Sequence, residues 1–540
     1  MTRRPSSATG RVAGLVAAVF VASSCTTSRA PAPPPVSQSR SASGSAAASQ
    51  TPSADGSPSA SALTQPPSPQ ELRPIDPATL ANFYSQRVAW SACGSGLECG
   101  SLKVPLDYTN PSGAVLSLAL IRHVSTAPDR IGSVVLNPGG PGGSGVQFAK
   151  TAWQAISKEL QDRFDVVSFD PRGVGASEPI RCVSSKVEDD FVSYDADPHD
   201  ASEVAALGRL DAEFANGCAQ KSGALLPHVG TVDTARDLDV LRAALGDAKL
   251  TYIGESYGTL LGAIYAQLFP THVRAMVLDG AVDPSLDDVA QGNGQARGFE
   301  TALKSFITWC VGRSDCALGR SASGAEARLD AWLDKLLTAP QVDRGRELTR
   351  SLATTAVATG LYSPASWSAL NAALRSAFDG NPSAMFALAD ALNGRQRDGS
   401  YSNLLEANVA INCADRPAAS GSINEAAQSA AAGAANGPTF GAQLGWGNST
   451  CIGWPVPAEL RPGPVRAAGA PPIVVIGNLR DPATPLVWAQ SLAAQLASGV
   501  LVTADLDGHT ANLRSSCVDG IVSAYVTTLK VPDDGTACPG

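Results

Sequence analysis

Short apolar runs recur along the chain from about residue 80, and longer stretches of helical period separate them. Because a buried strand is a continuous apolar run and a crossover helix follows it, this alternation predicts a mostly parallel central sheet with helices on both faces, an α/β fold. The candidate strands lie at 115–122, 132–136, 165–169, 249–253, 275–278, 472–476 and 499–504.

The interval 285–465 has a different pattern, rich in Ala and Leu and poor in strand-like runs. Helical periodicity is clearest at 298–311, 325–337, 364–378 and 381–392. Insertions in an open α/β sheet lie over the carboxyl ends of the strands, where ligands bind. We therefore predict a mainly helical cap at 285–465, inserted between two parts of the core at 73–284 and 466–540.

The N-terminal segment lacks this pattern. Residues 26–72 are mostly Ser, Ala, Pro, Gln and Gly, a composition that predicts a disordered tether. Before it, Arg3 and Arg4 precede an apolar run at 12–22 that is too short to span a bilayer. Small residues and Cys25 follow, as in a bacterial lipoprotein signal of residues 1–25. Ala22 stands where such signals usually carry Leu, so an ordinary secretory signal is the alternative. Either signal predicts export, the first with Cys25 as a lipid anchor in the cell membrane.

Composition narrows the possible partners. The net charge of −9 gives no basic surface for a phosphate backbone, so we expect no nucleic-acid partner. Without Cys25, ten of the 11 cysteines remain, an even number that fits disulfides in an oxidising compartment. Sequence neighbours suggest the pairs Cys93–Cys99, Cys182–Cys218, Cys310–Cys316, Cys413–Cys451 and Cys517–Cys538, although spacing alone does not establish connectivity. We expect no metal or cofactor, since the sequence has no CxxC pair and its five histidines lack ligand spacing.

The pentapeptide GESYG at 254–258 follows one candidate strand and precedes a helical stretch. A strand, a tight turn and a helix form the context of a GxSxG nucleophile elbow, with Ser256 as the nucleophile. In a chain with 51 glycines the motif alone can also be a plain turn. Its partners elsewhere in the sequence decide between these interpretations.

A carboxylate and an imidazole follow in the order that an α/β-hydrolase triad requires. Asp481 follows the strand at 472–476, and His509 follows the strand at 499–504. We predict that Ser256 is activated by His509 and that Asp481 orients the imidazole. Rival acids are Asp279, Asp283, Asp505 and Asp507, and the other histidines are His123, His199, His228 and His272.

The glycine-rich stretch 137–145 follows the strand at 132–136. Backbone N–H groups aimed at one point stabilise a tetrahedral oxyanion, and we assign these donors to Gly140 and Tyr257. A plain turn or a phosphate-binding loop is the alternative, but no Gly-Lys-Ser/Thr closes the stretch.

Several motifs in order resemble one family: NPGGPGGSG, FDPRGVGASEP, GESYGT, LDGAVDP, INCADRP, STCIGWP, RDPATP and GHT. From about residue 80 onward the chain is similar to the actinobacterial tripeptidyl aminopeptidases, secreted α/β-hydrolases related to proline iminopeptidases. The group includes mycobacterial cell-envelope serine hydrolases described as peptidases and as carboxylesterases. Pro138 replaces the histidine of the HGGPG loop of proline iminopeptidases, which argues against strict prolyl specificity.

The resemblance implies a serine peptidase that removes short peptides from a free N-terminus through an acyl-enzyme. Such an enzyme needs a carboxylate for the substrate ammonium group, and the candidates are Glu255, Asp283 and Asp415. Thr484 can position Asp481 or only cap a turn. The alternatives are a carboxylesterase or lipase with the same triad, and a non-catalytic binding module on a hydrolase scaffold. A peptide is the expected partner, and a monomer is the expected state.

Overall fold

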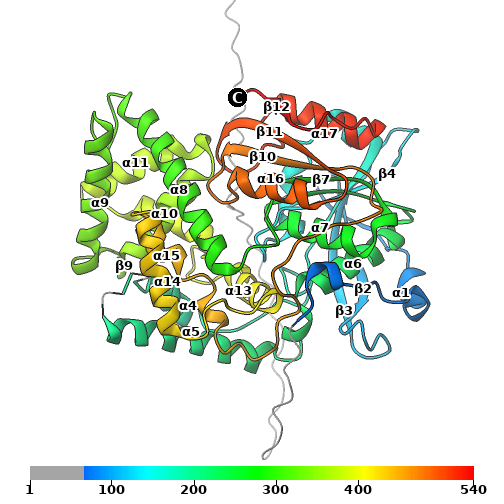
Figure 1. The fold of residues 1–540 in the computed structure, drawn as a ribbon, viewed down its shortest axis with the longest axis horizontal. Coiled ribbons are helices and arrows are strands. Elements are labelled where there is room, and N and C mark those ends of the chain that lie inside the picture. The colour runs from blue at the N-terminus through cyan, green and yellow to red at the C-terminus, as the bar shows by residue number, and fades with distance from the viewer. Residues whose placement is uncertain (1–65, 196, 199) are drawn as a thin grey trace, which may run out of the picture. The chain divides into compact units, whose positions relative to one another are not determined.

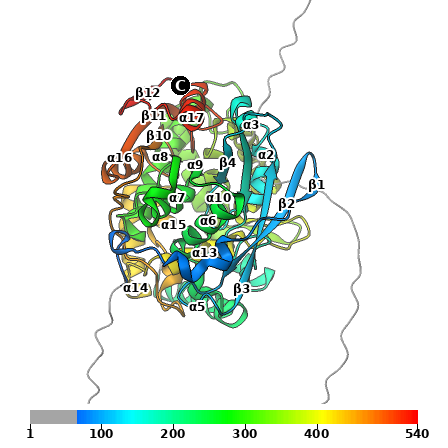
Figure 2. The ribbon, with the colours of Figure 1, turned by 90° about the vertical axis from the view of Figure 1, so that its right-hand side faces the viewer.

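The computed structural model describes residues 66–195, 197–198 and 200–540. Within these residues, ten strands form one sheet in the order β1-β2-β3-β5-β4-β6-β7-β10-β11-β12. The seven strands β5, β4, β6, β7, β10, β11 and β12 pair in parallel. The other three, β1, β2 and β3, form one edge of the sheet and pair antiparallel (Figure 2). The strands are β1 (Ser91–Gly94), β2 (Leu97–Pro105), β3 (Val115–His123), β4 (Gly132–Asn137), β5 (Phe164–Phe169), β6 (Leu250–Glu255), β7 (Val273–Asp279), β10 (Ile473–Arg480), β11 (Gly499–Asp507) and β12 (Thr536–Cys538).

The apolar runs form the centre of this sheet. Every residue of β4 and β5 is buried, as expected for parallel strands covered on both faces. Helices of one face pack in the largest apolar cluster, and helices of the other face pack with Val134, Val166 and Val277. The core helices are α1 (Ala81–Tyr84), α2 (Gly145–Ala152), α3 (Lys158–Arg163), α6 (Thr231–Leu245), α7 (Tyr257–Leu268), α16 (Leu486–Gln495) and α17 (Ser516–Thr528). The predicted α/β sheet is confirmed.

A helical cap is inserted between β7 and β10 and has its own apolar core (Figure 1). Its helices are α8 (Asp288–Val311), α9 (Ala322–Thr338), α10 (Arg350–Leu361), α11 (Trp367–Phe378), α12 (Ser383–Asn393), α13 (Leu404–Asp415), α14 (Ile423–Asn436) and α15 (Gly441–Gly445), with a small hairpin of β8 (Gln341–Asp343) and β9 (Arg346–Leu348). The predicted inserted helical region is therefore present, and it contains more helices than the periodicity alone suggests.

The cap also includes chain from before the insertion. Helix α4 (Ser185–Ser193) contacts α10 and helix α5 (Ala201–Ser222) contacts α14, at the cap end of the molecule in Figure 1, although residues 73–284 are predicted to belong to the core. Asp211 of α5 accepts hydrogen bonds from Ser449 and Thr450. Arg395 pairs with Asp189 of α4 at 2.7 Å. These contacts join segments more than 200 residues apart, which periodicity cannot reveal.

The described chain includes the end of the segment predicted as tether. Pro69 and Leu72, placed in the tether 26–72, are buried, and Leu72 packs in the core cluster. Cys25 and the remainder of the signal and tether lie outside the described residues, as does His199. In the part of the chain that is described, no helix is both long and apolar enough to cross a bilayer.

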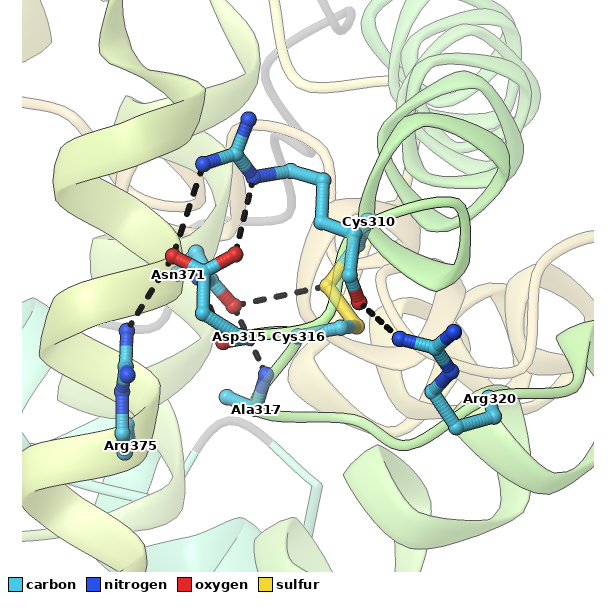
Figure 3. The surroundings of a disulfide bond; sticks show 8 residues. Cys310, Asp315, Cys316, Ala317, Arg320, Asn371 and Arg375 are labelled. Carbon is cyan, nitrogen blue, oxygen red and sulfur yellow. Dashed lines mark hydrogen bonds and ion pairs between the residues drawn. A yellow bond between two sulfur atoms is a disulfide. The ribbon is translucent and has the colours of Figure 1, made fainter.

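Five disulfides lie within the described residues, and they join the pairs that the sequence neighbours suggest. The Cys310–Cys316 loop of the cap illustrates how such a loop is held (Figure 3). Asn371 of α11 accepts a hydrogen bond from the N–H of Ala317 and donates one to the carbonyl of Asp315. Disulfides of this number fit an exported protein, because cytosolic reductants keep thiols reduced.

Candidate active site

Five neighbouring parallel strands, β4, β6, β7, β10 and β11, end at the same edge of the sheet. The loops that follow them therefore meet there, as ligand-binding loops do in open α/β sheets. These loops carry the glycine-rich stretch, Ser256, Asp481 and His509, and Asp279 is the last residue of β7. The topology thus gathers residues that are far apart in sequence.

Ser256 lies in a strained turn between β6 and α7. Its φ of 56° and ψ of −125° are rare for a residue with a side chain. A Cβ on Gly254 would lie 2.4 Å from the carbonyl oxygen of Gly258, so glycine is required there. The N–H of Ser256 donates to the carbonyl of Asp279 at 2.9 Å. These features are those of a nucleophile elbow.

Asp481 and His509 form the expected pair. The His509 Nδ1 lies 2.9 and 3.0 Å from the two carboxylate oxygens of Asp481, which is only 2% exposed. The same carboxylate accepts the N–H groups of Ala483, Thr484 and Thr510. Since Nδ1 is occupied, the imidazole has Nε2 available to accept a proton, and no described residue bonds to this buried nitrogen.

The imidazole lies against the loop after β7. A Cβ on Gly280 would be 3.0 Å from His509 Cε1, and Gly280 adjoins Asp279, whose carbonyl binds the Ser256 N–H. The hydroxyl of Thr484 lies 3.3 Å from His509 Nδ1, and the Thr484 N–H binds Asp481. Thr484 therefore contacts both members of the pair.

The rival residues have other partners. Asp279 accepts main-chain N–H groups after His509, Asp283 bonds to Ser285 and Gln495, and Asp505 and Asp507 bond to Arg480. Among the other histidines, His123 stacks on Trp153, His228 lies 3.6 Å from Asp233, and His272 lies 2.8 Å from Asp239. Of the candidate acids and the described histidines, Asp481 and His509 are the ones that pair beside the elbow.

The glycine-rich loop 138–144 packs directly on the elbow. A Cβ on Gly139 would lie 2.8 Å from the nitrogen of Tyr257, and Gly139 and Gly140 have φ of 84° and 113°, values that favour glycine. The side chain of Asn137 fixes the loop by accepting the Gly139 N–H at 3.0 Å. The N–H groups of Gly140 and Tyr257 donate to no described residue. The two assigned oxyanion donors are thus unpaired; Tyr257 directly follows Ser256, and Gly140 follows the glycine that packs on the elbow.

The cap contributes helix α13 to this site, and α13 also contacts α6 (Figure 2). Asn408 of α13 donates to the carbonyl of Pro141 in the glycine-rich loop at 3.0 Å. Asp415, at the end of α13, accepts the N–H and the hydroxyl of Thr231 at 2.5 and 2.6 Å. The Thr231 hydroxyl also bonds to the phenol of Tyr257 at 2.6 Å. Thr231 therefore links Asp415 to Tyr257, the residue after Ser256. No sequence motif indicates this role of Thr231.

The other two candidates for binding a substrate ammonium group are placed differently. Glu255 accepts a hydrogen bond from the Asn512 side chain at 3.3 Å, in the loop that carries His509. Asp283 is engaged by Gln495 at 2.8 Å and by Ser285. Of the three, Asp415 alone terminates a cap helix that touches the glycine-rich loop.

We expect the activity to rise with pH through a value above 6.5. Burial lowers the pKa of His509, but the neighbouring carboxylates, Asp481 foremost, together outweigh burial, so the pKa of His509 is raised from 6.5. A general base must be neutral, so activity is lost as pH falls through this raised pKa. In Asp481→Asn the acid limb of kcat/KM should move to lower pH, and kcat should fall about 10⁴-fold. A pH profile of ester hydrolysis measures both effects, and an unmoved limb would contradict the pairing.

The fold and the arrangement of Ser256, Asp481 and His509 define a serine hydrolase. Residues 132–508 match the family model of the α/β hydrolase fold, and the chain belongs to this family. It is 40% identical to the serine protease Hip1 of Mycobacterium tuberculosis over 479 residues, covering 84% of this chain and 91% of that protein. It is 35% identical to carboxylesterase B of the same organism, with coverage of 85% and 91%. It is 33% identical to a tripeptidyl aminopeptidase of Streptomyces lividans, with coverage of 84% and 86%.

Proposed function

We propose that this serine hydrolase is an aminopeptidase-type peptidase that releases short peptides from a free N-terminus. Ser256 Oγ attacks the scissile carbonyl while His509 Nε2 takes the hydroxyl proton, and the N–H groups of Gly140 and Tyr257 hold the oxyanion. His509 then gives the proton to the leaving amine. Water, activated by His509, hydrolyses the acyl-enzyme and restores Ser256.

The position of Asp415 carries this proposal. Asn408 contacts the glycine-rich loop and Asp415 lies seven residues further along α13, so the rise of the helix separates them by about 10 Å. Three extended residues also span about 10 Å. A three-residue acyl group that lies along α13 would therefore bring its N-terminal ammonium to Asp415. The tripeptidyl aminopeptidase relative supports the same substrate length.

The charge around Asp415 suits a cation. Burial raises the pKa of Asp415 to about 6, and no described Lys, Arg or His forms an ion pair with it. The neighbouring Arg416, which lowers the pKa of Asp415 by a smaller amount, donates to the carbonyl of Leu286. The carboxyl of Glu459 also approaches, since a Cβ on Gly230 would meet both Glu459 Oε2 and Asp415 Oδ1. An ammonium group would favour the ionised form of these carboxyl groups by opposite charge.

In Asp415→Asn, KM for tripeptide amides with a free amino group should rise about tenfold to a hundredfold, because a charge-assisted hydrogen bond is lost. Rates with N-acetylated peptides and with acyl esters should not change. The measurement compares kcat/KM for these three substrates in both proteins. Asp211→Asn, which removes a buried cap carboxylate held by Ser449 and Thr450, is the matched control. Equal cleavage of free and acetylated peptides by the wild-type enzyme would reject the aminopeptidase.

A carboxylesterase with the same triad is the second candidate. The relative named carboxylesterase B, at 35% identity, favours it. An esterase needs no ammonium site, so its kcat/KM for short acyl esters should exceed that for free tripeptide amides in wild-type and Asp415→Asn enzyme alike. The same substrate panel therefore separates the two functions.

We also propose that the enzyme is exported and held at the membrane by a lipid on Cys25. The five disulfides of the described chain and the N-terminal signal pattern support export. Mass spectrometry of the mature N-terminus distinguishes an acylated Cys25 from ordinary signal cleavage. A mature chain without acylated Cys25 would leave a secreted enzyme.

A further inference from the structure

Three residues with side chains adopt left-handed backbone conformations around the catalytic pair. Ser256 has φ of 56°, and Thr510 and Leu513 in the loop 508–515, here called the histidine loop, have φ of 63° and 66°. Each such residue costs about 1–3 kcal/mol and persists only when the surrounding structure holds it. The elbow and the histidine loop therefore need firm external contacts.

Asp279 supplies contacts to both. It is the last residue of β7, next to β6 in the sheet, and it is fully buried. Its carbonyl accepts the Ser256 N–H at 2.9 Å. Its carboxylate accepts the N–H groups of Ala511 and Asn512 at 2.9 and 2.7 Å. One residue thus bonds to the nucleophile through its main chain and to the histidine loop through its side chain.

Asn512 makes a second connection. Its side-chain amide donates to Glu255, the residue before Ser256, at 3.3 Å. The histidine loop also bonds to the end of β10. There Asn478 donates to two carbonyls of the loop, and Asp481 accepts the Thr510 N–H. Among the described residues, the hydrogen bonds between the histidine loop and β6 or β7 are those received by Asp279 and Glu255.

We propose that Asp279, Asn512 and Glu255 form a clasp that sets the separation of Ser256 Oγ and His509 Nε2. The three are positioning residues, because each acts through the elbow or the histidine loop. The clasp serves the attack of Ser256 on any acyl group, so it applies equally to peptide and ester substrates. Its role is therefore independent of the aminopeptidase proposal, and so is its test.

The clasp also contributes charge to the site. Burial raises the pKa of Asp279 to about 6 and that of Glu255 to about 7. The charged groups facing them are His509, Asp481 and Arg514. Both carboxylates add to the effect of Asp481 in raising the pKa of His509. Loss of either charge should therefore lower the pKa of the base, whereas loss of the neutral Asn512 should not.

The test uses the rate of labelling by a fluorophosphonate, which reports attack by Ser256 without a peptide subsite. Asn512→Ala should lower the labelling rate and kcat for an ester about tenfold to a hundredfold, since small misplacements of reacting groups have effects of this size. KM should change less than about twofold, because the clasp does not touch substrate. In Asp279→Asn and Glu255→Gln the acid limb of kcat/KM should also move to lower pH.

Asp247→Asn is the matched control for Asp279→Asn. Asp247 also accepts a main-chain N–H, that of Ser133, but at the start of the strands, at the opposite edge of the sheet. This variant should label at the wild-type rate with an unmoved pH limb. Thermal unfolding of each variant checks that it is folded, and Asn512→Ala keeps the test valid if Asp279→Asn fails to fold. If folded Asn512→Ala is labelled at the same rate as the wild-type enzyme, the proposal is overturned.

Discussion

Ser256→Ala should abolish labelling by a fluorophosphonate and lower hydrolysis of every accepted substrate about 10⁶-fold. Loss of the nucleophile removes the covalent step, and the oxyanion donors alone retain only a small residual rate. Stoichiometric labelling of the wild-type enzyme, followed by mass spectrometry of the labelled peptide, measures the effect. The strained backbone of Ser256 and the unpaired Nε2 of His509 are the structural reasons to expect it.

Ser112→Ala, a change at an exposed serine before β3, is the matched control and should label like the wild type. Labelling of folded Ser256→Ala at another residue would place the nucleophile elsewhere. Absence of labelling in the folded wild-type protein would instead favour a non-catalytic binding module on a hydrolase scaffold.

Asp237→Ala should destabilise the fold by about 3–5 kcal/mol, because it removes the bidentate partner of a buried guanidinium and leaves it only the more distant carboxylate of Asp233, at 3.4 Å. Arg172 has 0% of its side chain exposed and donates to both oxygens of Asp237 at 2.6 and 2.7 Å. Despite burial, which lowers the pKa of Arg172, Asp237 outweighs it and raises that pKa, so the arginine stays charged. Equilibrium unfolding in urea measures the loss, with an unchanged slope as evidence of two-state unfolding.

Asp190→Ala is the control for this prediction. Asp190 pairs with Lys186 on the surface of α4, and its removal should leave the urea midpoint unchanged because exposed pairs contribute little. The Arg172 pair joins the FDPRGVG loop to α6, whose first residue Thr231 binds Asp415. A urea midpoint of Asp237→Ala equal to that of the wild type would show that Arg172 is compensated by Asp233 and by the main-chain carbonyls it also contacts.

Much of the proposed catalytic arrangement follows from order along the chain. In a parallel sheet every strand ends at the same edge, so residues just after different strands come together whatever their distance in sequence. Ser256, Asp481 and His509 could therefore be chosen from strand-end positions alone. The disulfide pairs can likewise be suggested from the sequence, because each joins cysteines that are neighbours along the chain.

The roles of residues that act through long-range contacts cannot be predicted from their positions in the sequence. Asp279 has the strand-end position of a catalytic acid, and only its contacts with Ala511 and Asn512 show that it holds the histidine loop. Helices α4 and α5 fall in the range predicted to belong to the core, yet they contact α10 and α14 of the cap. An amphipathic helix can bury its apolar face against the sheet or against the cap. The hydrophobic period therefore does not show which of the two it packs on.

The α/β sheet, the elbow and the order of the proposed triad can be predicted from the sequence, because they depend on local backbone preference and on where strands end. Which carboxylate faces which group becomes known only from the folded chain: Asp481 faces the imidazole, Asp279 the histidine loop, and Asp415 the hydroxyl of Thr231. The sequence around an Asp or Glu does not show whether its carboxylate orients a base, accepts main-chain N–H groups or binds a cation. Its burial and its neighbours, which folding supplies, make the difference.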